Sequence, residues 1–432
     1  MRMVKSIIER FKNSKIIKNS IWMILATIIQ MFISLFLNIF IARYLGANNY
    51  GVINYGLSFV NFFASVCTLG LNTIVIKYLV TEKENQGQII WTCILLRIIS
   101  SIISIMLILI VIVFLKGYDQ LILITTFLQS ITLIFDSFSI INLWYQSKLE
   151  SKYTAVVTFI AYIVMALYKI ILLIAKKNVI WFAASHCVSS LVTSILLIIL
   201  YKKHNGQKFS FSLPKGKELL KQSYHFIISG LMVAVYAQTD KIMIGSMIKD
   251  ISAVGYYSVA TTVVSLWSFI PTAIINSFQP NILETKKVDS NSYEKKLVQL
   301  YTIVIYLSIL YTLFILVFGR LLVLILYGNE YLPAVVSLKI AIIGCLFSFV
   351  GVIREFWLIC ENKQKYAKWF ALIGVITNIV LNFIMIPFLG IEGAAIATTI
   401  TQIMTGLFAP LFFRDTRLAF KHFLKALIFQ YQ

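Results

Sequence analysis

Charged residues are scarce in this sequence. Asp, Glu, Lys and Arg make up 13% of its 432 residues, about half of the roughly 25% found in soluble domains. Hydrophobic residues make up 59%, which excludes a fully solvated surface. A spanning helix needs about 20 apolar residues, so this composition supplies enough for twelve spans. The sequence therefore predicts a polytopic membrane protein with no sizeable soluble domain.

Motifs for enzymatic chemistry and metal binding are also missing. The sequence has no Gly-x-x-x-x-Gly-Lys-Ser/Thr loop, no His-Glu-x-x-His and no Gly-x-Ser-x-Gly, so neither an ATP motor nor these hydrolase sites are indicated. The five cysteines lack Cys-x-x-Cys spacing and are expected to be buried free thiols. We predict no catalytic residue, no metal site and no cofactor.

Twelve apolar stretches separated by short polar segments predict twelve transmembrane helices. Six of them precede a longer polar stretch and six follow it. Their approximate bounds are 20–42, 52–76, 89–114, 121–145, 154–175, 179–201, 224–247, 255–280, 298–318, 336–360, 367–388 and 392–413.

Lys and Arg are distributed unevenly over the connecting segments. With these spans, 27 of the 38 Lys and Arg residues lie at the termini and loops of one side, six lie on the other side and five lie within spans. Cytoplasmic loops are enriched in Lys and Arg, so both termini are predicted to be cytoplasmic. The net charge of +21 follows from this topology and does not indicate nucleic-acid binding.

The predicted chain has five parts. A basic amphipathic N-terminus (1–19) precedes a first lobe (20–201), a cytoplasmic linker (202–222), a second lobe (223–413) and a basic amphipathic tail (414–432). The two terminal segments mix Lys and Arg with Ile, Leu and Phe, which is typical of helices lying on an anionic membrane surface.

Short motifs recur at matching places in the two halves. A tryptophan is followed eight residues later by Lys-Tyr, at Trp144 with Lys152-Tyr153 and at Trp357 with Lys365-Tyr366, a shift of 213. Lys18-Asn19-Ser20 likewise matches Lys221-Gln222-Ser223, and Gly51 and Gly255 follow these serines by 31 and 32 residues. These matches predict a duplication.

Six helices per half place the start of both halves on the same side of the membrane, so the repeats are parallel. We therefore predict an all-α integral membrane fold, with twelve helices in two six-helix bundles around a central cavity. This layout is typical of an alternating-access transporter. A symmetric scaffold that transports nothing is the other interpretation.

Ionisable side chains within spans are costly and are expected to face a cavity or a partner. The predicted substrate-binding cations are Lys241, Lys169, Arg97, Arg354 and Arg43, and the predicted coupling or charge-pairing acids are Asp240, Asp136 and Glu355. The excess of cations predicts an anionic substrate, and Arg suits bidentate contact with phosphate.

Several alternatives stay open for these residues. Arg43 can extend to the membrane interface, and Asp136 can pair with Arg97. Arg354 and Glu355 can form a local structural pair, although neighbouring helical residues point about 100° apart and need not neutralise each other. The same spacing applies to Asp240 and Lys241.

Three stretches resemble polysaccharide-unit flippases (the Wzx type) of the multidrug/oligosaccharidyl-lipid/polysaccharide exporter superfamily. They are Arg43-Tyr44-Leu45-Gly46 with Tyr50-Gly51, then Gln238-Thr239-Asp240 with Ile244-Gly245 and 254–260, and then Asn378, Leu381-Asn382, Pro387 and 390–395. The glycines suit the short turns between helices. Arg43 and Asp240 match motif positions of the family.

The resemblance implies a V-shaped pair of six-helix bundles that moves an undecaprenyl-pyrophosphate-linked oligosaccharide from the inner to the outer leaflet. It also implies a bacterial inner membrane, a role in O-antigen or capsule biosynthesis, and polysaccharide polymerase and chain-length machinery as partners. Two alternatives remain: a cation-coupled multidrug exporter of the same superfamily and a non-transporting scaffold of the assembly machinery. An enzyme such as a polymerase or ligase is the least favoured interpretation.

Overall fold

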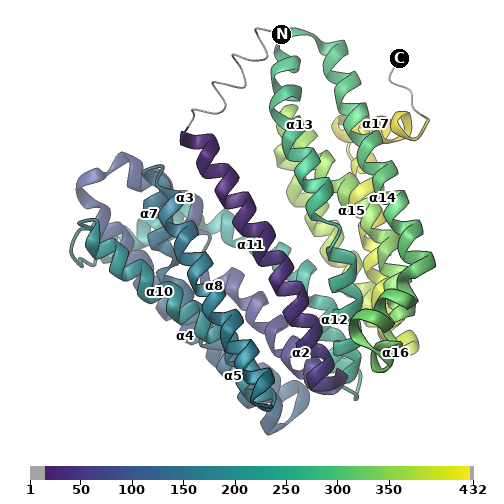
Figure 1. The fold of residues 1–432 in the computed structure, drawn as a ribbon. Helices are drawn as coiled ribbons and strands as arrows, with labels where there is room; N and C mark the ends of the chain where they lie inside the picture. Colours follow the sequence, from purple (N-terminus) through teal and green to yellow (C-terminus); the bar gives the residue numbers. More distant parts are fainter. Residues whose placement is uncertain (1–14, 429–432) are drawn as a thin grey trace. The chain divides into compact units, whose positions relative to one another are not determined.

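The computed structural model describes residues 15–428, with side chains from residue 30 onward except Lys287. Every regular element in this range is helical and none is a strand (Figure 1). The predicted all-α fold is therefore confirmed. The predicted amphipathic N-terminus, 1–19, lies outside the described residues apart from the first turn of α2.

The first half of the chain contains nine α-helices in its described part. They are α2 (Lys15–Cys67), α3 (Leu71–Thr81), α4 (Gln86–Lys116), α5 (Gln120–Ser130), α6 (Thr132–Asp136), α7 (Ile140–Ser147), α8 (Ser151–Ile174), α9 (Val179–Ala183) and α10 (Ser185–Lys203). Short 3₁₀ turns at Lys83–Asn85 and Ser137–Ser139 join some of them.

The second half contains seven α-helices in its described part. They are α11 (Leu213–Met247), α12 (Ser252–Ser265), α13 (Phe269–Val288), α14 (Ser290–Tyr327), α15 (Ala334–Cys360), α16 (Ala367–Ile403) and α17 (Arg417–Leu427). A π-helix at Met404–Phe408 and 3₁₀ turns at Asn329–Tyr331, Gln364–Tyr366, Ala409–Phe412 and Arg414–Thr416 complete it.

Ten helical stretches in the described range are long and apolar enough to cross a membrane. Two of them, Gln30–Thr81 and Gln364–Phe412, have 52 and 49 residues. Gly46, with φ of 73°, lies near the middle of the first stretch, and Gly390, with φ of 60°, lies near the middle of the second, and only glycine adopts this conformation readily. The chain turns at both glycines, so these two stretches cross twice and the predicted twelve crossings are confirmed.

Two predicted bounds differ from the structure. The second predicted span, 52–76, is interrupted at Leu69 and Gly70, which have φ of 50° and 60°. The predicted span 298–318 is too short, because α14 has 38 residues and a length of about 57 Å at 1.5 Å per residue. Asp289 starts this helix early, since its side chain accepts hydrogen bonds from the backbone N–H groups of Asn291 and Ser292.

The structure confirms the duplication at the motif that predicted it. At the end of α7, the N–H of Glu150 donates to the carbonyl of Tyr145 at 2.9 Å, and at the end of α15 the N–H of Lys363 donates to Leu358 at 2.8 Å. Both bonds enclose a left-handed residue, Leu149 or Asn362, as in a Schellman cap. Each pair of these positions is related by the shift of 213 found in the sequence.

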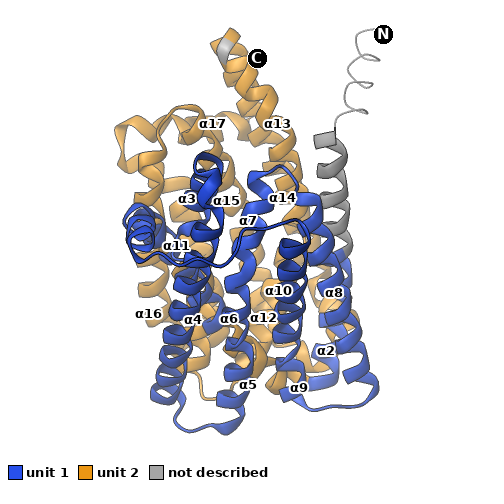
Figure 2. Cartoon of the chain, turned by 90° about the vertical axis from the view of Figure 1, so that its left-hand side faces the viewer, with its two compact units in different colours: residues 1–45, 59–231 blue, residues 46–58, 232–432 orange. Residues whose placement is uncertain are grey.

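The chain forms two compact units (Figure 2). The first contains the residues before Gly46 together with Phe59–Leu231, and the second contains Gly46–Ser58 and Met232–Gln432. The segment Gly46–Ser58 joins the second unit through two glycines. A Cβ on Gly51 would lie 2.2 Å from the carbonyl oxygen of Ile251, and one on Gly255 would lie 2.3 Å from that of Ala47. Only glycines allow α2 and α12 to approach so closely.

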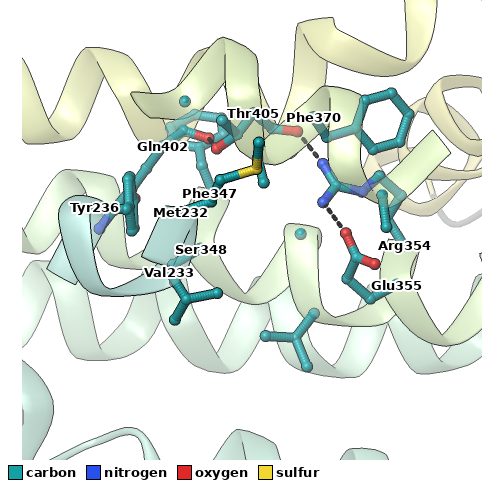
Figure 3. Close-up of a pocket in the computed structure, with 15 residues that line it drawn as sticks. Met232, Val233, Tyr236, Phe347, Ser348, Arg354, Glu355, Phe370, Gln402 and Thr405 are labelled. Carbon is teal, nitrogen blue, oxygen red and sulfur yellow. Dashed lines mark hydrogen bonds and ion pairs between the residues drawn. The ribbon is translucent and has the colours of Figure 1, made fainter. Parts of the chain in front are cut away.

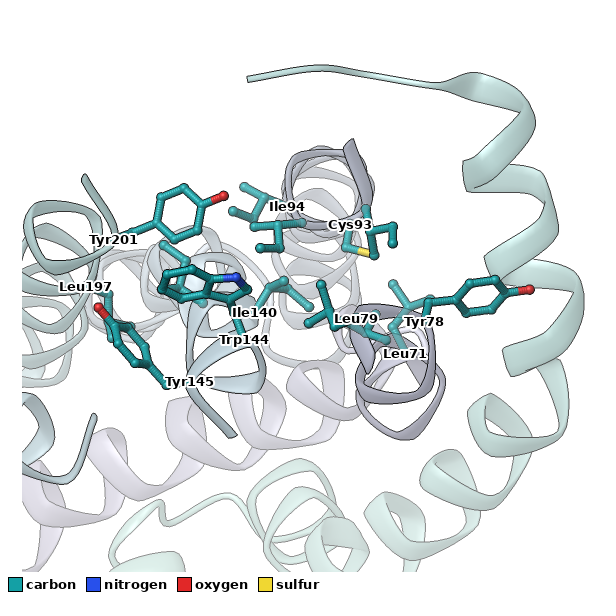
Figure 4. Close-up of a cluster of buried hydrophobic side chains, with 14 of the residues drawn as sticks. Leu71, Tyr78, Leu79, Cys93, Ile94, Ile140, Trp144, Tyr145, Leu197 and Tyr201 are labelled. Atoms are coloured by element: carbon teal, nitrogen blue, oxygen red, sulfur yellow. The ribbon is translucent and has the colours of Figure 1, made fainter. Parts of the chain in front are cut away.

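Aromatic residues fill the core at one end of the first unit (Figure 4). Trp144 is 2% exposed, and its ring lies 4.8 Å from that of Tyr201 and 4.9 Å from that of Tyr145. Its indole N–H donates to Gln86 Oε1 at 2.8 Å, which satisfies the one polar atom of the side chain. α3, α4, α7 and α10 meet around this cluster.

The predicted linker, 202–222, is fixed to the first unit. Gln207 Oε1 accepts from the N–H of Gly87 at 2.6 Å, and the N–H of Ser212 donates to Thr92 Oγ1 at 3.1 Å. α11 already begins at Leu213, and Lys215 forms an ion pair with Glu82 at 2.7 Å. The segment is an ordered part of the first unit, not a free connection.

The predicted amphipathic tail contains α17, whose buried face is formed by Ala419, His422, Phe423 and Ala426. Lys425 pairs with Glu294 at 2.7 Å, and Tyr306 donates to the carbonyl of Leu427 at 2.9 Å. Burial lowers the pKa of His422 to about 4, so its imidazole is neutral at pH 7. This helix is thus packed on α14 along one face.

The Gly51 contact gives a stability prediction. Gly51→Ala places a methyl group against backbone that cannot move away cheaply, so we expect a loss at or above the upper end of the ~1–3 kcal/mol typical of overpacking. Thermal unfolding of the purified protein in detergent measures it. Gly230→Ala is the matched control, because Gly230 has nothing within 4 Å of its added Cβ and Ala favours a helix. Equal melting temperatures for the two variants would contradict the close approach.

Candidate functional site

Asp240 on α11 is surrounded by hydrogen-bond donors within the second unit. Asn378 and Asn382 of α16 donate to its Oδ1 at 3.0 and 2.7 Å. Tyr257 of α12 donates to Oδ2 at 2.6 Å, and Thr398 donates to the same oxygen. Asp240 is 9% exposed, so these neutral groups replace the water that a carboxylate otherwise needs.

The sequence of α16 explains how one helix supplies three of these donors. Asn378 and Asn382 are four residues apart and therefore share a face. Pro387 and the break at Gly390 follow, and Thr398 lies on the returning arm. The chain thus reaches Asp240 from both of its last two crossings.

This group of side chains, which we call the Asp240 cage, also has unused acceptors. Oδ1 of Asn378 and Oδ1 of Asn382 are buried and accept no hydrogen bond in the structure. A carboxylate, amide oxygens and hydroxyls are the ligands that hard cations take. The cage is therefore chemically able to hold a monovalent cation or a proton on Asp240.

Lys169 is buried and Lys241 is half-buried, and neither is bonded to an acid among the described residues. Lys169 on α8 is 7% exposed. Lys241 adjoins Asp240 in sequence, yet the described residues include no ion pair with an acid for either lysine, within 4 Å. Lys169 is related to Asn382 by the repeat, so the two halves carry a cation and an amide at equivalent places.

Arg97 on α4 borders a cavity of about 310 Å³ in the first unit. Its guanidinium donates to Asn72 Oδ1 at 2.7 Å, to the carbonyl of Thr68 at 3.2 Å and to Ser139 Oγ at 3.2 Å. Asp136 lines the same cavity, but the two charges do not form an ion pair within 4 Å among the described residues. The arrangement fixes the guanidinium with neutral acceptors only.

Arg354 and Glu355 of α15 form the local pair that the sequence left open. Arg354 Nη2 lies 2.5 Å from Glu355 Oε1, and Nη1 donates to the carbonyl of Thr405 in the π-helix (Figure 3). The guanidinium carbon lies 4.5 Å from the centre of the Phe370 ring. Both residues line a second cavity, of about 240 Å³, within the second unit.

The remaining predicted cation, Arg43, is exposed on the first arm of α2, three residues before the turn at Gly46. Sequence reasoning missed Glu330, whose Oε1 accepts from the N–H of Ala47 at 2.6 Å directly after that turn. It also gave no role to Tyr257, Asn378 and Thr398. The signal for one of them was present, since two asparagines four residues apart are unusual in an apolar span.

The chain therefore combines twelve helical crossings in two related halves with ionisable side chains buried inside each half. These features define the fold of a secondary transporter with parallel repeats. No group of three or more His, Cys, Asp or Glu able to hold a metal ion occurs in the described part of the chain.

Comparison with known sequences identifies the family. Residues 16–286 match the family described as "Polysaccharide biosynthesis protein", and because this is more than half of the chain, the protein belongs to that family. A curated relative, the probable low-salt glycan biosynthesis flippase Agl15 of Haloferax volcanii, is 28% identical over 200 residues, which are 45% of this chain and 42% of the relative. The match thus spans less than half of that relative's length.

Comparison with solved structures shows the same fold in known transporters. The lipid II flippase MurJ in an inward closed conformation has a TM-score of 0.72 and 17% identity, over 95% of this chain and 92% of that one. An inward-facing multidrug resistance MATE family transporter of the MOP superfamily has a TM-score of 0.66 and 13% identity, over 92% and 96% of the two chains. The resemblance stated from the sequence motifs is thereby confirmed.

The Asp240 cage predicts an unequal cost for two tyrosine substitutions. Tyr257→Phe removes a donor to a buried carboxylate, for which we expect a loss of about 1.5–3 kcal/mol. Tyr311→Phe removes a neutral bond to the carbonyl of Val263 and should cost only about 0.5–1.5 kcal/mol. Thermal unfolding in detergent compares them. In an Asp240→Asn background the cost of Tyr257→Phe should shrink, and an unchanged cost would show that the two groups are not coupled.

Proposed function

We propose that this protein is a flippase that moves undecaprenyl-pyrophosphate-linked oligosaccharide units from the cytoplasmic to the outer leaflet by alternating access. Family membership, the fold shared with MurJ and the name of the archaeal relative support a lipid-linked glycan as cargo. The observation that carries the proposal is Lys169, a buried ammonium that forms no ion pair with an acid among the side chains that the structure describes.

An uncompensated charge in a membrane interior is expensive, so such residues mark a substrate or ion pathway. Lys169 and Lys241 supply two positive charges that the described part of the protein does not neutralise by ion pairs. A pyrophosphate carries the opposite charge, and its oxygens suit an ammonium group in either unit. We assign Lys169 and Lys241 to its binding.

The three arginines then have different tasks. Arg97 is held by three neutral acceptors and still borders a cavity, so it contributes a fixed positive potential with Asp136 opposite. Arg354 borders the other cavity. Arg43 follows the first crossing of α2 and lies at a motif position of the family, where it meets the head group near the turn.

Gradients supply the driving force. Moving about two negative charges outward through ~100 mV, inside negative, gains roughly 5 kcal/mol. We assign Asp240 as the site of a coupling cation or proton, with Asp136 and Glu355 as further coupling acids. A cation bound in the cage is coordinated by the free amide oxygens of Asn378 and Asn382.

The proposal places the protein in a bacterial inner membrane, with both termini in the cytoplasm because of the distribution of Lys and Arg. It acts there as a transporter and not as an enzyme. O-antigen or capsule assembly, with a polysaccharide polymerase and chain-length machinery as partners, is the setting that the family suggests.

A multidrug exporter is the second function, because MATE transporters share the fold. Cationic drugs need acids in the binding site, whereas here Asp240 is already met by neutral donors and Lys169 is positive. Resistance to cationic dyes on expression would favour the exporter. Surface glycan lost in a deletion strain and restored by the gene favours the flippase.

The Asp240 cage predicts a cation effect on stability. A cation that binds only the folded protein raises its melting temperature, so wild-type protein in detergent should melt higher in sodium chloride than in choline chloride at equal ionic strength. Asp240→Asn should remove the difference. An equal melting temperature of the wild type in the two salts would contradict sodium binding in the cage.

Lys169 and Lys241 predict a selective loss of transport. Lys169→Ala or Lys241→Ala should abolish surface polysaccharide in a complementation assay while the amount of membrane protein stays normal. Lys339→Ala is the control, because Lys339 lies near the start of α15, where a lysine can extend to the interface. Full surface glycan from both lysine variants would disprove a cationic binding site, and loss only after changes in 202–222 would indicate a scaffold.

A further inference from the structure

The cavity of about 240 Å³ in the second unit has a composition unlike that of a packing defect. Its volume exceeds the ~150 Å³ of an apolar cavity that binds benzene. α11, α15 and α16 supply its walls with the π-helix. Its apolar lining includes Met232, Val233, Phe347, Val352 and Phe370.

One end of this cavity carries the ion pair of Arg354 and Glu355. Figure 3 shows Arg354 at one end of the group and Tyr236 at the other. Arg354 is 6% exposed, and its Nε–H has no acceptor in the structure. A buried guanidinium with an unused donor is costly, and an anion in the cavity would remove that cost.

The π-helix explains why Arg354 is fixed at this place. The carbonyl of Thr405 would receive the N–H of residue 410 in a continued π-helical pattern, but residue 410 is proline and has no N–H. Arg354 donates to this carbonyl instead, and its guanidinium stacks on Phe370. The position of the positive charge is therefore set by the backbone.

Arg354 also lies near one end of α15. It is six residues before the end of α15 at Cys360, about 9 Å along the axis at 1.5 Å per residue. The loop beyond that end contains Lys363 and Lys365, the side assigned above to the cytoplasm.

We propose that this cavity is the loading site for the lipid end of the cargo: the isoprenyl units next to the pyrophosphate fill the apolar part, and Arg354 binds the pyrophosphate. The assignment rests on the proposed function. Val233 and Val352 are 63% and 41% exposed and form an apolar rim through which a chain enters. An isoprenyl pyrophosphate matches this combination of an apolar cavity and one bidentate cation.

Glu355 regulates the occupancy of this site by competition. It holds Arg354 through a single ion pair and is itself 44% exposed, so it can turn outward when a pyrophosphate offers two oxygens to the guanidinium. Return of Glu355 to Arg354 displaces the ligand. The pair thus keeps the empty site neutral without blocking it.

Binding of farnesyl pyrophosphate to the purified full-length protein in detergent tests the site. Val233→Trp should fill the entrance and weaken binding at least tenfold, and Arg354→Gln should do the same. Glu355→Gln should tighten binding several-fold, because the competing carboxylate is gone. Val317→Trp is the matched control, since Val317 is 70% exposed on α14 and lies outside the cavity; it should bind like the wild type.

Competing ligands identify the occupant. Inorganic pyrophosphate and phosphatidylglycerol should each displace farnesyl pyrophosphate poorly, because one lacks the chain and the other lacks the pyrophosphate. Equal displacement by phosphatidylglycerol would overturn the assignment in favour of an ordinary membrane lipid. Unchanged binding in Val233→Trp, with that variant folded as shown by its melting temperature, would overturn it as well.

Transport of a lipid-linked oligosaccharide in reconstituted vesicles separates this inference from the proposed function. If the wild type transports and Val233→Trp transports equally fast with unchanged binding, the loading site is refuted. The proposed flippase function is then still supported. Farnesyl pyrophosphate binding that depends on Arg354, without any transport by the wild type, supports the site and refutes the flippase.

Discussion

Hydrocarbon offers no water to a buried charge, and this constraint accounts for most of the polar structure inside the protein. Asp240 is met by two asparagines, a tyrosine and a threonine, and Arg97 by two side-chain oxygens and a carbonyl. Each of these charges is held by neutral groups, so its electrostatic field is not cancelled by an opposite charge bonded to it. Charges held in this way stay available to a ligand, whereas a tight ion pair would cancel them.

The same constraint applies to the backbone, since every N–H and C=O in a span must find a partner. Sharp turns are therefore placed where the sequence can tolerate them, at Gly46 and Gly390. Where a bond is lost, another group replaces it: Glu330 accepts from the N–H of Ala47 after the first turn, and Arg354 donates to the carbonyl of Thr405 before Pro410. Glu330 and Arg354 thus each satisfy a backbone group that lacks its helical partner.

Hydropathy predicts the crossings because each needs the same length of apolar chain, and the Trp and Lys-Tyr motif predicts the repeat because it marks a cap found in both halves. Hydropathy does not predict the interruption at Leu69 and Gly70, because neither residue lowers the hydropathy of the span. Asp240 is conspicuous in the sequence because an acid within an apolar span is energetically costly. Its partners do not, because Tyr257 is 17 residues away and Thr398 is 158 residues away, and only folding brings these crossings together.

Repeat-related positions show how the two halves diverged. Lys169 corresponds to Asn382 under the shift of 213, and the shift of 203 that relates Ser20 to Ser223 places Leu37 at the counterpart of Asp240. At these positions the first half has a cation and an apolar residue, whereas the second half has an amide and an acid. The amide Asn382 donates to the acid Asp240, so the divergence of the second half replaced a cation with a neutral partner for its own buried carboxylate.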